Sequence, residues 1–195
     1  GPGFAGLGGV GWLGGAGVKG RGRVSETPVI TNDLYPTILE MLGLPTRPHQ
    51  HVDGVSLASI VNGSGDLRRK ALFWHYPHYG NQGGCPASSI RNGPWKLIRY
   101  YESPHIELHN LQTDPGEQVN IIDEEPELAT QLAARLDHWL DASGATFPFP
   151  DPAHDKEKEQ TYIASRRDDL MPKLEAEHAE YLDPDWQPNA DWWGS

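Results

Sequence analysis

A leucine stripe in the second half of the chain constrains the fold more than any other feature. Leucines recur there at four-residue intervals, at Leu128, Leu132, Leu136 and Leu140. This spacing predicts an α-helix with one apolar face. Pro126 suits its first position, and Gly144 suits the position that ends it. A helix with one apolar face must bury that face against another layer, which the rest of the chain has to supply.

The segment before this helix is typical of strands. An aromatic run covers Ala71 to Tyr76, and Ile106 to Leu111 alternates between apolar and polar residues. Between them, Ser88 to Arg91 and Trp95 to Tyr101 flank the turn signal Asn92-Gly93-Pro94. We therefore predict the α+β fold class: a small antiparallel β-sheet packed by a C-terminal amphipathic helix.

The sequence divides into four parts. Half of the 22 glycines fall within residues 1–23, which indicates a disordered lead-in or an altered reading frame, because dense glycine disfavours regular structure. Residues 24–63 contain a predicted amphipathic helix, Asn32 to Leu42, with Thr31 and Asn32 as capping candidates. Residues 64–146 hold the sheet and the leucine helix. Residues 147–195 form a charged tail rich in proline and tryptophan.

Within that tail, Lys156 to Tyr181 is a candidate solvated helix, and we expect Pro172 to interrupt it. The apolar stripe of the earlier helix Asn32 to Leu42 consists of Leu34, Ile38 and Leu42, with Leu39 and Met41 beside it.

Charge and composition exclude several classes of protein. The net charge is -11, from 27 acidic and 16 basic residues, which argues against binding to nucleic acid or to an anionic membrane surface. No apolar run is long enough to predict a membrane span. Cys85 is the only cysteine, so an intrachain disulfide is excluded. The sequence does not predict an oligomeric state.

The densest polar and aromatic cluster lies between Leu72 and Gly84. Its candidate substrate-binding residues are His75, Tyr76, His78, Tyr79, Asn81 and Gln82. Aromatic faces cover the C–H patches of a sugar, and His, Asn and Gln side chains can bond its hydroxyls. The alternative is an aromatic strand packed under a helix, with its histidines satisfied locally.

Other kinds of site fit this cluster less well. His75 and His78 are three residues apart without a carboxylate or further His and Cys residues to complete a zinc set. Cys85 has no sequence feature that would activate it as a nucleophile. We therefore predict that this chain contributes no catalytic residue and binds no metal.

Several segments of the chain form an ordered set: TPVITNDLYPTILEMLGL (27–44), DGVSLASIVNG (53–63), LFWHYPHYGNQGG (72–84), SSIRNGPWKLIRYYE (88–102) and ELHNLQTDPGEQVN (107–120). In this order they resemble the C-terminal region of bacterial sulfatases of the formylglycine-dependent arylsulfatase family, in the alkaline-phosphatase-like superfamily. The resemblance implies that residues 24–63 end the catalytic domain and that residues 64–146 form the small C-terminal subdomain.

The resemblance also implies a function for the complete protein. Such enzymes hydrolyse sulfate esters of carbohydrates or aryl groups, with a formylglycine and a calcium ion held by an α/β core that this chain lacks. Cys85-Pro86-Ala87-Ser88-Ser89 does not match the C/S-x-P-x-R motif of that core. The resemblance places His75 to Gln82 near the mouth of the active site and suggests a periplasmic or secreted location. The alternative is a stand-alone carbohydrate-binding or interaction module that shares the subdomain.

Overall fold

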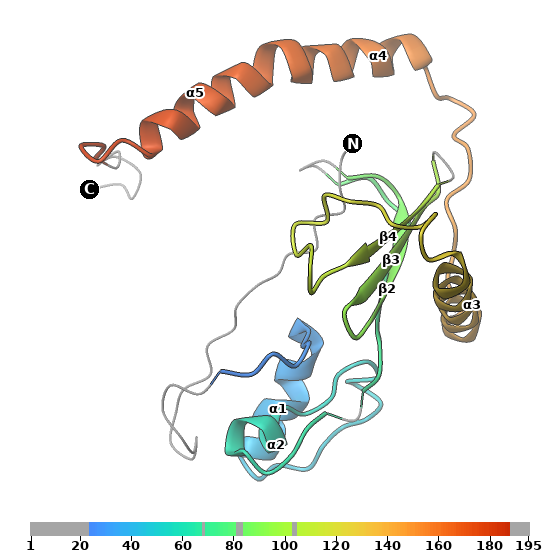
Figure 1. The fold of residues 1–195 in the computed structure, drawn as a ribbon, viewed down its shortest axis with the longest axis vertical. Coiled ribbons are helices and arrows are strands. Elements are labelled where there is room, and N and C mark those ends of the chain that lie inside the picture. The colour runs from blue at the N-terminus through green and yellow to red at the C-terminus, as the bar shows by residue number, and fades with distance from the viewer. Residues whose placement is uncertain (1–23, 68, 81–83, 103–104, 188–195) are drawn as a thin grey trace. The chain divides into compact units, whose positions relative to one another are not determined.

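The computed structural model describes residues 24–67, 69–80, 84–102 and 105–187. The glycine-rich lead-in of residues 1–23, Asn81 and Gln82 lie outside them. The chain divides into two compact units, residues 1–148 and 149–195. Unit 1 contains, in order, η1 (Thr31–Asp33), α1 (Leu34–Met41), α2 (Ala58–Asn62), β1 (Leu72–Tyr76), β2 (Ala87–Asn92), β3 (Trp95–Tyr100), β4 (Ile106–Asn110) and α3 (Pro126–Ser143) (Figure 1).

The four strands form one antiparallel sheet in the order β1-β2-β3-β4. The β2–β3 hairpin turns at Gly93, whose φ of 61° lies in the left-handed region that favours glycine. Its register pairs Ile90 with Leu97, and the next hairpin pairs Leu97 with Leu108. Because side chains alternate across a strand, these three residues share one face of the sheet. The predicted antiparallel sheet is confirmed.

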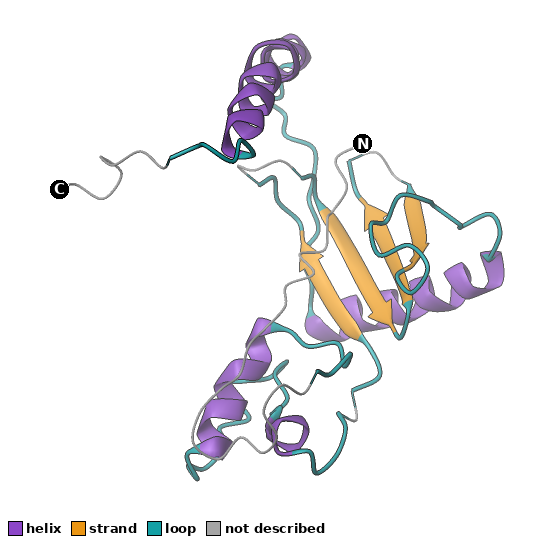
Figure 2. Ribbon diagram, turned by 60° about the vertical axis from the view of Figure 1, so that its left-hand side comes forward, coloured by secondary structure: helices purple, strands orange, loops and turns teal. Residues whose placement is uncertain are grey.

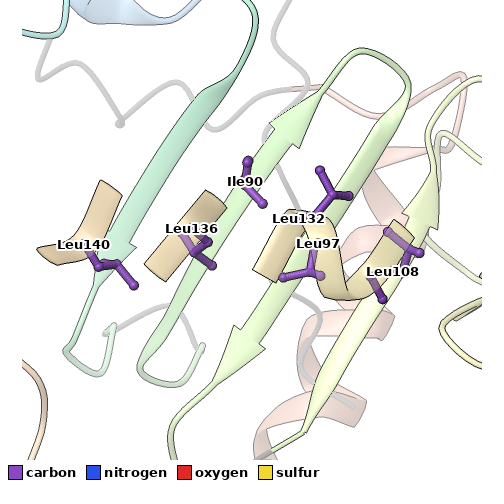
Figure 3. Packing of buried hydrophobic residues seen from close by; sticks show 7 residues of the cluster. Ile90, Leu97, Leu108, Leu132, Leu136 and Leu140 are labelled. Atoms are coloured by element: carbon purple, nitrogen blue, oxygen red, sulfur yellow. The ribbon is translucent and has the colours of Figure 1, made fainter. Parts of the chain in front are cut away.

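Helix α3 covers that face (Figure 2). It begins at Pro126 and ends before Gly144, whose φ is 65°. The side chains of Leu132, Leu136 and Leu140 are buried against Ile90, Leu97 and Leu108 (Figure 3). Leu128 is only partly buried, and Ala129 is buried in the first turn in its place. The α+β class, with a small sheet packed by this helix, is confirmed.

The loop after β4 protects the edge of the sheet. The Asn120 side chain accepts the Leu108 N–H at 2.9 Å, and the Ile121 N–H donates to the Leu108 carbonyl. Glu117 of this loop pairs with Lys96 of β3 at 2.7 Å, and both side chains are largely buried. An edge strand exposes unpaired backbone groups that invite association. The segment 107–120 therefore has a structural role, because the side chains of Glu117 and Asn120 hold this loop against the sheet.

The first helix differs from the prediction. Leu34 and Ile38 of its expected apolar stripe are 42% and 55% exposed, whereas Pro36 and Thr37 are buried. The predicted caps Thr31 and Asn32 are also wrong, because the side chain of Asp33 accepts the Ile30 N–H at 2.9 Å.

Asp33 sets this arrangement. It is fully buried, binds Arg69 through both carboxylate oxygens at 2.7 and 2.8 Å, and accepts the Val55 N–H. We call Asp33, Arg69 and Val55 the Asp33 clasp. Burial opposes the ionisation of Asp33, but the bonds from Arg69, Ile30 and Val55 outweigh it and lower the pKa of this carboxyl. The clasp orients the helix, so polar contacts decide which of its faces is buried.

Unit 2 contains α4 (Lys156–Ser165), the π-helical segment η2 (Arg166–Leu170) and α5 (Met171–Tyr181). Asp155 caps the N-terminus of α4, where its side chain accepts hydrogen bonds from the backbone N–H groups of Glu157 and Lys158. Helical backbone continues through Pro172, so the predicted interruption is wrong. Proline clashes with the carbonyl four residues earlier in a regular α-helix. Here the five residues before Met171 are π-helical, and the wider turn accommodates the ring.

Candidate substrate-facing site

The predicted site residues lie at the end of β1 and just beyond it. His75 and Tyr76 are the last two residues of β1, and His78 and Tyr79 belong to the segment that follows. Asn81 and Gln82 lie outside the described residues. Since neighbouring side chains of a strand point to opposite faces, His75 and Tyr76 lie on different sides of the sheet. The described members therefore form two groups.

His75 lies on the α3 face, and both of its ring nitrogens have partners. Nε2 donates to the Thr146 carbonyl at 2.7 Å, and Nδ1 lies 2.6 Å from the Ser88 hydroxyl. Ser88 Oγ lies 2.6 Å from the Tyr101 hydroxyl. A carbonyl only accepts, so in the neutral ring Nε2 carries the hydrogen, Ser88 donates to Nδ1, and Tyr101 donates to Ser88. His75 thereby ties the segment after α3 to the sheet.

Aromatic rings complete this contact. Phe147 packs edge-on against His75 and Tyr101, with ring centroids 5.6 Å away in each case. We call His75, Ser88, Tyr101, Thr146 and Phe147 the His75 latch. Sequence reasoning missed its other members. The predicted antiparallel sheet could have suggested Ser88 as a neighbour of β1, but nothing in the pattern indicates that Thr146 returns to the sheet.

Tyr76, His78 and Tyr79 form the second group, which reaches solvent. Tyr76 is 43% exposed and Tyr79 is 65% exposed, and His78 is exposed as well. The Tyr76 and His78 rings meet edge-on with centroids 5.5 Å apart. Exposed aromatic faces beside a histidine offer both apolar contact and hydrogen bonding. This group can therefore bind a polar ligand that carries C–H patches.

The face of the sheet opposite α3 carries its own polar cluster. Glu107 Oε2 accepts a hydrogen bond from the Tyr100 hydroxyl at 3.1 Å. The Nε2 atom of His105 lies 3.4 Å from Glu107 Oε1, and the Nε2 atom of His109 lies 3.5 Å from Glu107 Oε2. His109 is buried, and its Nδ1 donates to the Val119 carbonyl. These contacts fix the loop after β4, so the cluster is explained by the fold.

Cys85 lies beside this polar face and is partly buried. Burial raises the pKa of its thiol, and the nearby carboxylates of Glu102 and Glu107 raise it further. A nucleophilic cysteine needs the opposite environment, with cations or a helix N-terminus that stabilise the thiolate. The geometry around Cys85 agrees with its mismatch to the sulfatase motif.

A separate cavity of ≈ 240 Å³ lies at the start of β1. Arg69 of the Asp33 clasp lines it together with Asn32 and Asp53, and Phe73 and Trp139 form its aromatic wall. Those two rings stack with centroids 5.1 Å apart. The described predicted residues, His75 to Tyr79, do not line this cavity, so it is distinct from the candidate site.

Residues 24–67, 69–80, 84–102 and 105–187 contain no group of three His, Cys, Asp or Glu side chains placed to hold a metal ion. Their helices include none with the length and apolar character that a bilayer span requires.

Comparison with known proteins decides the family. The family model described as N-sulphoglucosamine sulphohydrolase, C-terminal, matches residues 17–143. The chain belongs to this family. Membership implies a metal in the complete enzyme. The residues that the structure describes supply no donor set that fits such an ion, so its ligands would have to come from outside them.

Relatives of this sulfatase C-terminal domain carry sulfatase names. A sulfatase of Formosa agariphila is 36% identical over 126 residues, which are 57% of this chain and 23% of the relative. Arylsulfatase K of Mus musculus is 29% identical over 130 residues, 63% of this chain and 23% of the relative. The chain therefore spans under a quarter of the length of the curated relatives that it matches.

Solved structures support the fold. A 2-O GAG sulfatase matches with a TM-score of 0.50 and 23% identity, over 57% of this chain and 24% of that one. A candidate sulfatase from Bacteroides thetaiotaomicron matches with a TM-score of 0.53 and 22% identity, over 62% of this chain and 27% of that one. The small sheet with its helix is thus the C-terminal subdomain fold of sulfatases.

Proposed function

We propose that this chain is the C-terminal part of a sulfatase that hydrolyses sulfate esters of sulfated carbohydrates. Tyr76, His78 and Tyr79, with Asn81 and Gln82, contact the sugar and set substrate choice. His75 supports them from the other face of the sheet, through the latch. The catalytic groups and a calcium ion belong to a core outside this chain, and the complete enzyme works in the periplasm or outside the cell.

The family match over residues 17–143 is the observation that carries this proposal. The exposed stripe of α1 supports it, because Leu34, Ile38 and Leu42 form an apolar helix face that the described residues leave uncovered. A catalytic core packed on α1 would bury this face. The same observation disfavours the alternative of a stand-alone module, which would leave the stripe in water.

The roles of the two groups can be separated in the complete enzyme. We expect His78→Ala to lower kcat/KM on a sulfated oligosaccharide roughly 10- to 100-fold, since losing a bond to a sugar hydroxyl costs about 1–3 kcal/mol. Activity on a small aryl sulfate, which lacks the sugar hydroxyls, should change little. His138→Ala removes an exposed histidine from α3 and serves as the control.

His75→Ala should act differently. Loss of the latch should lower the thermal unfolding midpoint and reduce activity on both substrates together. Equal losses for His78→Ala on both substrates, through kcat alone, would assign His78 to the sulfate pocket and contradict its proposed role.

The chain by itself should not turn over an aryl sulfate. Cys85 lacks the motif for conversion to formylglycine, and its surroundings disfavour a thiolate. The assay compares the purified chain with its Cys85→Ala variant. Turnover by the first that the second lacks would overturn the proposal that the core supplies the chemistry.

A further inference from the structure

The helix of unit 2 carries an apolar face with few contacts among the described residues. Trp186 packs edge-on against Tyr181 with ring centroids 5.1 Å apart, and Arg166 lies over the Tyr162 ring at 4.7 Å from its centroid. None of the residues of α4, η2 and α5, all of which are described, is buried. The large apolar side chains of this helix and of Leu182 after it are Tyr162, Ile163, Leu170, Met171, Leu174, Tyr181 and Leu182. We call them the unit 2 stripe. Ile163 and Met171 are 52% and 48% exposed.

The π-helical segment brings these residues onto one side. Ile163 and Met171 are eight residues apart, which in a regular α-helix would leave them about 80° out of line. Each residue of a π-helical segment turns the chain less than an α-helical residue does, because its hydrogen bonds span five residues rather than four. With η2 between them, the two side chains align. Leu170 and Tyr181 are eleven residues apart, close to three full turns.

Charge is distributed unevenly along the same helix. Its first half, residues 156–168, has a small basic excess, with Lys156, Lys158, Arg166 and Arg167 against Glu157, Glu159 and Asp168. Its second half, residues 169–181, is net acidic, with Asp169, Glu175, Glu177 and Glu180 against Lys173. Each half therefore has the charge that would attract the other half of an identical helix.

We propose that two copies of this chain associate through an antiparallel pairing of their unit 2 stripes. Antiparallel packing places the basic half of one helix along the acidic half of its partner and opposes the two helix dipoles. Leu170 and Met171, near the middle of the helix, meet their counterparts at the two-fold axis, as an isologous interface requires. A parallel arrangement would set acidic residues against acidic residues.

Stability gives the second reason for a partner. A helix that buries no side chain gains little from packing, and helical propensity alone leaves such lengths marginal in water. Pairing would cover the stripe along the whole helix. The overall charge of -11 opposes association at long range, but at about 0.15 M salt this repulsion is screened beyond roughly 8 Å while adjacent helices still interact.

The test is the mass of the chain in solution, measured by sedimentation equilibrium at about 0.15 M salt. We expect a monomer–dimer equilibrium, and Leu174→Glu should raise the dimer Kd at least tenfold. Ala179→Glu adds the same charge on the opposite side of the helix and should leave the Kd nearly unchanged. Circular dichroism of both variants checks that the helix content is equal. A wild-type chain that stays monomeric at 100 µM, or equal effects of the two variants, would overturn the proposal.

Orientation is tested by charge reversal. Lys156→Glu with Lys158→Glu should weaken the dimer, and the further changes Glu177→Lys and Glu180→Lys in the same chain should restore it. Both sets of changes favour the isolated helix, because they put acids at its N-terminus and bases at its C-terminus. Weakening therefore cannot come from loss of the helix. Failure of the four changes together to restore pairing would overturn the antiparallel arrangement.

Discussion

Asp33 holds three segments of unit 1 together, at the start of α1, at Val55 and at Arg69. Its pKa is lowered, so the carboxylate stabilises the fold above its unfolded pKa near 3.9 and loses this effect as the pH falls through the lower folded value. Asp33→Asn should reduce the free energy of unfolding at pH 7 by about 1.5–3 kcal/mol. Urea denaturation at pH 7 and below pH 4 measures this.

The difference between wild type and Asp33→Asn should shrink on the acid side of that window, because Asp33 itself becomes neutral there. Asp66→Asn, at an exposed position, provides the control and should change stability by less than about 0.5 kcal/mol. A difference that stays constant with pH would show that the charge of Asp33 is not what stabilises the clasp.

Cys85 offers a second prediction at the scale of one residue. Its thiol pKa is raised by burial and by the carboxylates of Glu102 and Glu107, so alkylation by iodoacetamide near pH 8 should be slower than that of a free cysteine. The rate should rise with pH to a midpoint above the usual range of a thiol. Glu102→Gln should lower that midpoint, whereas an unchanged midpoint would exclude its carboxylate as a cause.

At the scale of elements, the α3 helix and the sheet depend on the buried leucines. Leu132 is 1% exposed among Ile90, Leu97 and Leu108, so Leu132→Ala should cost roughly 2–5 kcal/mol through lost transfer energy and a cavity. Leu128→Ala, on the same stripe but only partly buried, should cost clearly less. Urea denaturation of both variants measures the contrast, and equal losses would contradict the packing seen in Figure 3.

At the scale of the whole molecule, we expect unit 1 to keep its sheet and its helix α3 when unit 2 is removed. The buried core clusters lie within unit 1, and the helices of unit 2 contain no buried residue. A chain ending at Pro148 should therefore unfold with nearly the midpoint of the full chain. One ending at Gly144 loses Thr146 and Phe147 of the His75 latch and should unfold at a lower temperature. Thermal unfolding of both by circular dichroism tests this, and a low midpoint for the Pro148 chain would show that unit 2 stabilises unit 1.

Local pattern predicted much of unit 1. Strands β1 to β4 lie within one residue of their expected bounds because alternation and the Asn92-Gly93 turn act over neighbouring residues. Helix α3 was equally evident, since its stripe, Pro126 and Gly144 all lie within one short stretch. Pattern also suggested the aromatic residues of the candidate site, and their role in binding a sugar stays a prediction.

The sequence by itself determined the sheet, the leucine helix and the family, because each depends on residues close together in the chain. Only the tertiary structure decided which side chains face which neighbours. It buried Thr37 instead of Ile38 on α1, because Asp33 finds Arg69 thirty-six residues away. It turned His75 toward Thr146, seventy-one residues away, while its neighbour Tyr76 reaches solvent. Hydrogen bonds between such distant residues leave no periodic trace in a sequence, since either partner alone is an ordinary polar residue.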